Sequence, residues 1–251
     1  YRGFVYNHHL DWRDPKADRA RAGYDNFHAL DGQFDSNVIV QIKNGPIDFQ
    51  VREPVSPLFA GLRRTNEAIE LQITQEYTGQ QRHLVFLVPM WKTALDTDMH
   101  VPDTRPSRVQ DIVTGKAFAR PMGSFVGVAN VGLDDYWLGN PLAMANLYGF
   151  GRLAWNPALS SADISDEWTR LTFGNDADVR RVVDGLLLNS WHIYEEYTGP
   201  LGVGTLTDII GPHYGPGIES AERNGWGQWI RADHNGVGMD RTVATGTGYI
   251  G

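Results

Sequence analysis

The sequence predicts an α/β protein in which strands of a parallel sheet alternate with helices and a mainly helical region follows. Four short runs rich in apolar, β-branched and aromatic residues are separated by helical patterns, and the strand runs are continuous rather than alternating. After Asn156-Pro157 the pattern is helical only. We therefore expect a boundary near residue 157, between half a barrel over residues 1–157 and the start of a helical domain over residues 158–251.

Each element has its own local signals. The expected strands are residues 3–6, 38–42, 68–74 and 124–131. A helix is expected over 14–28, where Pro15 can take the first helical position after an Asp cap. The other expected helices are 58–66 (a short helix or turn), 84–99 in spite of Pro89, 135–152, 161–173 and 176–197.

Composition excludes several classes of function. The chain has no cysteine, which excludes disulfides, cysteine-ligated metals and cysteine nucleophiles. Its net charge of −8 is a poor match to phosphate backbones, so no nucleic-acid partner is expected. The longest apolar run, residues 84–91, is far below the roughly 18 residues of a membrane span, so no membrane partner is expected either. The 8 Trp, 10 Tyr and 10 Phe could stack on sugar rings or fill a large core.

Polar residues cluster just past the expected strands. They are Asn7-His8-His9, Lys43-Asn44-Gly45, Gln75-Glu76-Tyr77 and Asn130. In parallel α/β folds, ligands bind at the carboxyl ends of the strands. This placement predicts a binding site formed by these segments.

Two carboxylates in these segments could act together. Asp48 follows a Gly-Pro turn after the second strand, and Glu76 follows the third. Glycoside hydrolysis uses two such groups, one to protonate the leaving oxygen and one to activate water. The alternatives are a turn-capping Asp48 and a structural ion pair for Glu76. Lys43 could hold an anionic substrate group or be a solvated surface lysine.

Other catalytic patterns are absent from the sequence. The histidines show no metal-ligand spacing, no serine lies in a G-x-S-x-G elbow, and no phosphate-binding glycine loop is found. We therefore expect neither a metal nor a cofactor.

Several long strings resemble the α-glucuronidases of glycoside hydrolase family 67. Residues 38–54 read VIVQIKNGPIDFQVREP and residues 72–80 read QITQEYTGQ. The resemblance continues through GVANVG (127–132), YGFGRLAWNP (148–157), EWTRLTFG (167–174) and ERNGWGQW (222–229). It covers essentially the whole chain.

The resemblance implies a (β/α)8 TIM barrel, of which this chain supplies the C-terminal half, strands five to eight, followed by a helical domain that also mediates dimerisation. It implies inverting removal of 4-O-methyl-D-glucuronic acid, α-1,2-linked to the terminal xylose of xylan-derived oligosaccharides (aldouronic acids). By the same resemblance, Asp48 and Glu76 match the two carboxylates that activate water. Lys43 matches a uronic-acid contact, and Trp226 matches a tryptophan of the pocket.

The family's general acid is a Glu on an earlier strand, which would lie upstream of Tyr1, as would a smaller N-terminal domain. Both ends of the chain look cut, and we expect residues 1–251 alone to be inactive and prone to aggregate, because half a barrel leaves an unpaired edge. Two other functions fit the residues: a barrel glycosidase for a different sugar, or a carbohydrate-binding module that uses the tryptophans.

Overall fold

The structure is a computed structural model that describes residues 19–44, 55–74, 78, 83–129, 132–133, 135 and 140–198. Its elements are α1 (Arg19–His28), β1 (Ile39–Lys43), α2 (Leu58–Gly61), β2 (Asn66–Gln72), α3 (Val88–Asp96), α4 (Val109–Val113), β3 (Gly123–Val128), a 3₁₀ turn (Pro141–Ala143), α5 (Met144–Trp155), α6 (Ser161–Phe173) and α7 (Ala177–Thr198). No helix within these ranges is long and apolar enough to cross a membrane.

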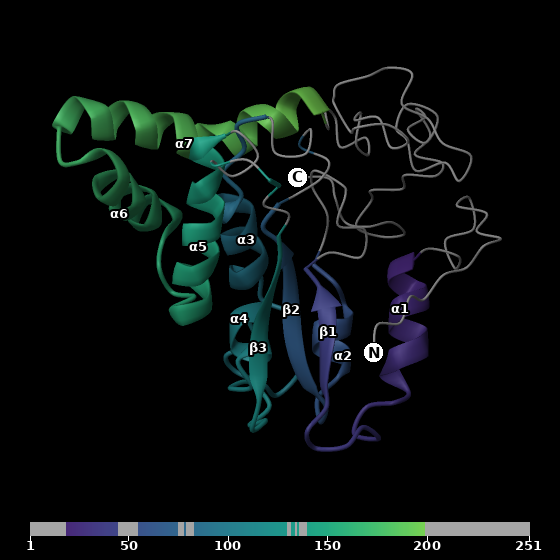
Figure 1. Ribbon diagram of the computed structural model, residues 1–251. Coiled ribbons are helices and arrows are strands. Elements are labelled where there is room, and N and C mark those ends of the chain that lie inside the picture. The colour runs from purple at the N-terminus through teal and green to yellow at the C-terminus, as the bar shows by residue number, and fades with distance from the viewer. Residues whose placement is uncertain are drawn as a thin grey trace, which may run out of the picture.

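The three described strands form one parallel sheet in the order β1-β2-β3, which confirms the mixed α/β class (Figure 1). The strand expected at residues 3–6 lies outside the described residues. The continuous apolar runs in the sequence predict strands that are buried on both faces, and burial in the structure differs from this pattern. β2 is buried along nearly its whole length, whereas β1 and β3, the edges of the described sheet, have exposed positions.

Helices cover one face of the sheet. α4 packs against β2 and β3, and α5 packs against β3. Gly123 permits this approach, because a Cβ there would lie 2.0 Å from the carbonyl oxygen of Val113 in α4. The strands run toward α7, which extends across the same end of the molecule as their carboxyl ends (Figure 1).

One apolar core joins the sheet to the helices, including α6 and α7. Its largest fully buried side chains are Trp91, Tyr194, Phe59, Phe86, Leu62, Ile69, Leu71, Leu87, Leu95, Ile112, Leu153 and Ile164. The 84–91 run that suggested a helix therefore lies in the middle of the core.

Two helices have bounds in the structure that differ from those expected from the sequence. The helix expected over 84–99 starts at Val88, since Pro89 lacks an N–H and fits only the first turn. The helix or turn expected over 58–66 ends at Gly61, and β2 begins at Asn66.

The C-terminal helices follow the sequence pattern more closely. α6 has the expected bounds, and its N-cap residue Ser160 accepts a hydrogen bond from the Asp163 N–H. α7 is shifted by one residue from the expected 176–197. α5 begins at Met144, later than expected, after the 3₁₀ turn capped by Asn140.

Candidate functional site

The face of the sheet opposite the core is polar near the carboxyl ends of the strands. Ile42 of β1 belongs to the core, so its neighbours Gln41 and Lys43 project from the opposite face, because side chains alternate along a strand. Lys43 is half-buried and ends the strand, rather than lying one residue beyond it as expected. A cation therefore lies at the carboxyl end of β1.

A carboxylate on the neighbouring strand lies beside this lysine. Glu70 of β2 is the register partner of Lys43, so both side chains project from the same face of the sheet. Glu70 is only 6% exposed, and its Oε2 accepts a hydrogen bond from Gln41 Nε2. This carboxylate is held within the sheet itself, whereas Asp48 and Glu76 come from segments that follow strands.

The other predicted site residues, Asp48, Glu76 and Trp226, lie outside the described residues.

Sequence reasoning missed Glu70 and Gln41 as site residues. Both interrupt runs that are otherwise apolar, and their shared position on the polar face was available from period-2 counting along the strands. Within the described ranges, no group of three or more histidine, aspartate or glutamate side chains could hold a metal ion.

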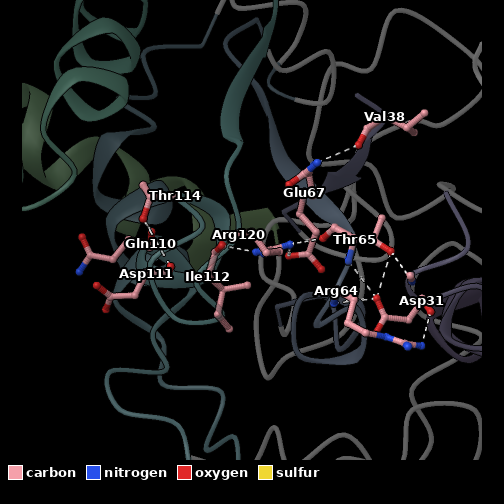
Figure 2. A network of polar contacts seen from close by, with 12 residues as sticks. Asp31, Val38, Arg64, Thr65, Glu67, Gln110, Asp111, Ile112, Thr114 and Arg120 are labelled. Atoms are coloured by element: carbon pink, nitrogen blue, oxygen red, sulfur yellow. Dashed lines mark hydrogen bonds and ion pairs between the residues drawn. The ribbon is translucent and has the colours of Figure 1, made fainter. Parts of the chain in front are cut away.

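A second polar network lies at the amino ends of the strands, away from this face (Figure 2). The Arg120 guanidinium donates to the backbone carbonyls of Thr65 and Ile112, and its Nη1 is 3.2 Å from Glu67 Oε2. Burial raises the pKa of Glu67 to about 9, although the positive charge of Arg120 opposes that rise. The network joins the segment before β2 to α4 and the segment before β3.

Asp31 extends this network to the segment after α1 (Figure 2). Its Oδ1 accepts hydrogen bonds from the N–H groups of Arg64 and Thr65 and from the Thr65 hydroxyl, at 2.9–3.0 Å. Burial opposes ionisation of Asp31, but these hydrogen bonds keep its pKa below the ordinary value. We interpret both clusters as structural, since their polar atoms serve the chain's own backbone.

A cation and a carboxylate at the carboxyl ends of parallel strands are typical of α/β proteins that bind polar ligands at this edge. Comparison with known proteins identifies the family. The family model for the glycosyl hydrolase family 67 middle domain matches residues 1–137, and the model for the family 67 C-terminus matches residues 138–251. The chain therefore belongs to glycoside hydrolase family 67.

Named relatives agree with this assignment. The chain is 58% identical over 251 residues to "Alpha-glucuronidase A" of Aspergillus tubingensis, and 57% identical over 251 residues to "Probable alpha-glucuronidase A" of Aspergillus niger. It is 58% identical over 254 residues to "Probable alpha-glucuronidase A" of Aspergillus fumigatus. All of this chain is covered in each comparison, but it spans only 30% of the length of each relative.

Proposed function

We propose that this chain forms part of an α-glucuronidase that removes 4-O-methyl-D-glucuronic acid from aldouronic acids with inversion. The observation that carries the proposal is the half-buried Lys43 at the carboxyl end of β1, beside the buried carboxylate of Glu70. A uronic acid carries a carboxylate, and a lysine ammonium can bind it by a charge-assisted hydrogen bond. Membership of family 67 and the names of the relatives support the same activity.

In this proposal β1, β2 and β3 are the sixth, seventh and eighth strands of a (β/α)8 barrel, residues 3–6 are the fifth, and the helical domain starts near residue 157. The polar face of the described sheet is then the interior of the barrel. The general acid is a Glu outside residues 1–251, and the whole protein is a homodimer. The parallel order of the sheet and the helices on its apolar face support the strand assignments.

Asp48 or Glu76 acts as the general base in the proposed reaction. The base takes a proton from water as the water attacks the anomeric carbon, while the general acid protonates the leaving oxygen of xylose. Trp226 forms a wall of the sugar pocket. Glu70 faces Lys43 from the neighbouring strand and limits the directions in which the ammonium group can point.

The full-length protein tests the proposed activity directly. Incubated with an aldouronic acid and followed by ¹H NMR, it is expected to release the β-anomer of 4-O-methylglucuronic acid first, because inversion at an α-linkage gives the β-anomer. Residues 1–251 alone are expected to release none, because the general acid is absent. Initial release of the α-anomer contradicts inversion, and appreciable turnover by the isolated chain contradicts the missing-acid proposal.

Lys43→Ala in the full-length protein is expected to lower kcat/KM for the aldouronic acid by about 10- to 100-fold, the loss that one charged hydrogen bond predicts. An analogue whose uronic carboxylate is reduced to a hydroxymethyl group should be affected far less. The matched control is Lys116→Ala, since Lys116 is exposed and pairs with Asp111 beside α4. Equal losses on both substrates show that Lys43 does not bind the carboxylate.

A further inference from the structure

We infer that Glu70 of β2 is a substrate-binding residue that accepts a hydrogen bond from a ring hydroxyl group of the uronic acid. This inference rests on the proposed function, because it takes a uronic acid as the sugar bound at Lys43. It goes beyond that function by assigning a contact with the sugar ring to a carboxylate that lies within a strand.

Glu70 lies on the polar face of the sheet, between β1 and β3. Its register partners are Lys43 on β1 and Val126 on β3, so all three side chains project from the same face. Of these two partners only Lys43 is polar. The carboxylate therefore has a cation on one side and an apolar side chain on the other.

The carboxylate of Glu70 is buried, yet few of its acceptor positions are used. Glu70 is 6% exposed, and within the described part of the chain its side chain accepts a hydrogen bond from Gln41 Nε2 alone, at Oε2. A carboxylate can accept about four hydrogen bonds, and a buried one is costly unless its oxygens are bonded. Glu70 thus has acceptor capacity left for hydrogen-bond donors that come from a ligand.

The chemistry of the two neighbouring groups fits a uronic acid. A carboxylate binds hydroxyl groups and repels another carboxylate, so the sugar's own carboxylate belongs at Lys43 and its hydroxyl groups belong at Glu70. Neighbouring strands are about 4.8 Å apart, so Lys43 and Glu70 can contact two substituents of one pyranose ring. 4-O-methylglucuronic acid linked through C1 has free hydroxyl groups at C2 and C3, and one of these is the donor to Glu70.

This contact is expected to contribute to substrate specificity. Burial of Glu70 limits competition from water, which strengthens a hydrogen bond to its charged oxygens. A site that bonds a hydroxyl group discriminates against an analogue that lacks this group. Lys43 and Glu70 together would then select a sugar that carries both a carboxylate and a correctly placed hydroxyl group.

The test uses the full-length protein with three substrates: an aldouronic acid and its analogues that lack the hydroxyl group at C2 or at C3 of the uronic acid. Glu70→Gln is expected to lower kcat/KM for the aldouronic acid by about 10- to 100-fold, the loss of one charge-assisted hydrogen bond. For one of the two deoxy analogues the same substitution should change kcat/KM by less than about twofold, since the bond is already absent.

Glu67→Gln is the matched control. Glu67 is a buried glutamate on the same strand, but it lies on the opposite face and pairs with Arg120. Any loss of activity in Glu67→Gln should be equal for the three substrates. Gln41→Met is a second variant at an exposed position, and it removes the donor that fixes Glu70 Oε2. It should lower kcat/KM by about 2- to 10-fold, with the same dependence on the substrate as Glu70→Gln.

The inference is overturned if Glu70→Gln lowers kcat/KM by the same factor for all three substrates, which is the result that a purely structural role predicts. If Glu70→Gln does not fold, Gln41→Met decides by the same criterion. A wild-type protein that releases no uronic acid removes the proposed function and this inference with it. A wild-type protein that cleaves the aldouronic acid, beside a Glu70→Gln protein with equal losses on all three substrates, removes the inference alone.

Discussion

At least one of the variants Asp48→Asn and Glu76→Gln in the full-length protein is expected to lower kcat/KM for an aldouronic acid by about 100-fold or more. General-base catalysis contributes about 10²- to 10⁴-fold, and an amide of the same shape cannot accept the proton from water. Each substitution removes one negative charge while changing the volume of the side chain little.

The pH dependence of kcat/KM distinguishes the two carboxylates. Activity of the wild-type enzyme falls at low pH as the base becomes protonated, and this acidic limb should disappear in the variant that lacks the main base. Asp178→Asn and Glu196→Gln are matched controls on exposed turns of α7 and should retain activity. If neither Asp48→Asn nor Glu76→Gln loses about 100-fold, the general-base assignment is wrong.

Arg120→Ala is expected to lower the free energy of unfolding by about 3 kcal/mol or more, because two hydrogen bonds from a charged donor to backbone carbonyls are lost, each worth about 1.5–3 kcal/mol. Arg63→Ala is the matched control. The Arg63 and Arg120 guanidinium carbons lie 6.0 and 5.4 Å from the centroid of the same Phe118 ring, but Arg63 is exposed. The Arg63 change should cost less than about 1 kcal/mol. Urea denaturation of the full-length protein measures the free energy of unfolding of both variants. Equal decreases in the two variants would falsify the stabilising role of the Arg120 hydrogen bonds.

The free energy of unfolding is also expected to depend on pH, because the carboxyl group of Glu67 pairs with Arg120 in this network. The pKa of Glu67 is about 9 in the folded protein, above its ordinary value of 4.5, so the folded state holds a proton that the unfolded state releases between these values. The stabilisation is complete below about pH 4.5 and is lost as the pH rises through about 9. Glu67→Gln cannot ionise and should flatten this decline. An unchanged slope between pH 5 and 9 shows that Glu67 is ionised in the folded protein.

Local signals predicted those parts of the fold that local interactions determine. α6 was predicted at its observed bounds, 161–173, and the structure shows a local reason for its start, because Ser160 caps the helix. α4 was missed, since five residues are too few to show a helical period. The apolar run from residue 84 was assigned to a helix because nothing near it indicates that its backbone bonds side chains 59 and 104 positions later.

In the candidate site too, local features were predicted and contacts between distant segments were not. Lys43 was predicted from its position at the end of an apolar strand, and the structure places it at that end. Period-2 counting could have placed Glu70 on the polar face, but its pairing with Lys43 depends on the register between β1 and β2, which the sequence alone does not reveal. Asp48, Glu76 and Trp226 stay predictions.

The apolar core continues from Ile42 to Tyr194, across residues 137 and 138, where the two family models meet. Val88 lies close against Gly149, where a Cβ would be 2.2 Å from Val88 Cγ2. The N–H groups of Phe86 and Leu87 donate to Ser190 and Asn146 and also connect the two sides of that point. The two family segments therefore share one apolar core. Cutting the chain between them would expose apolar surface on both pieces, and neither piece is expected to stay soluble without the other.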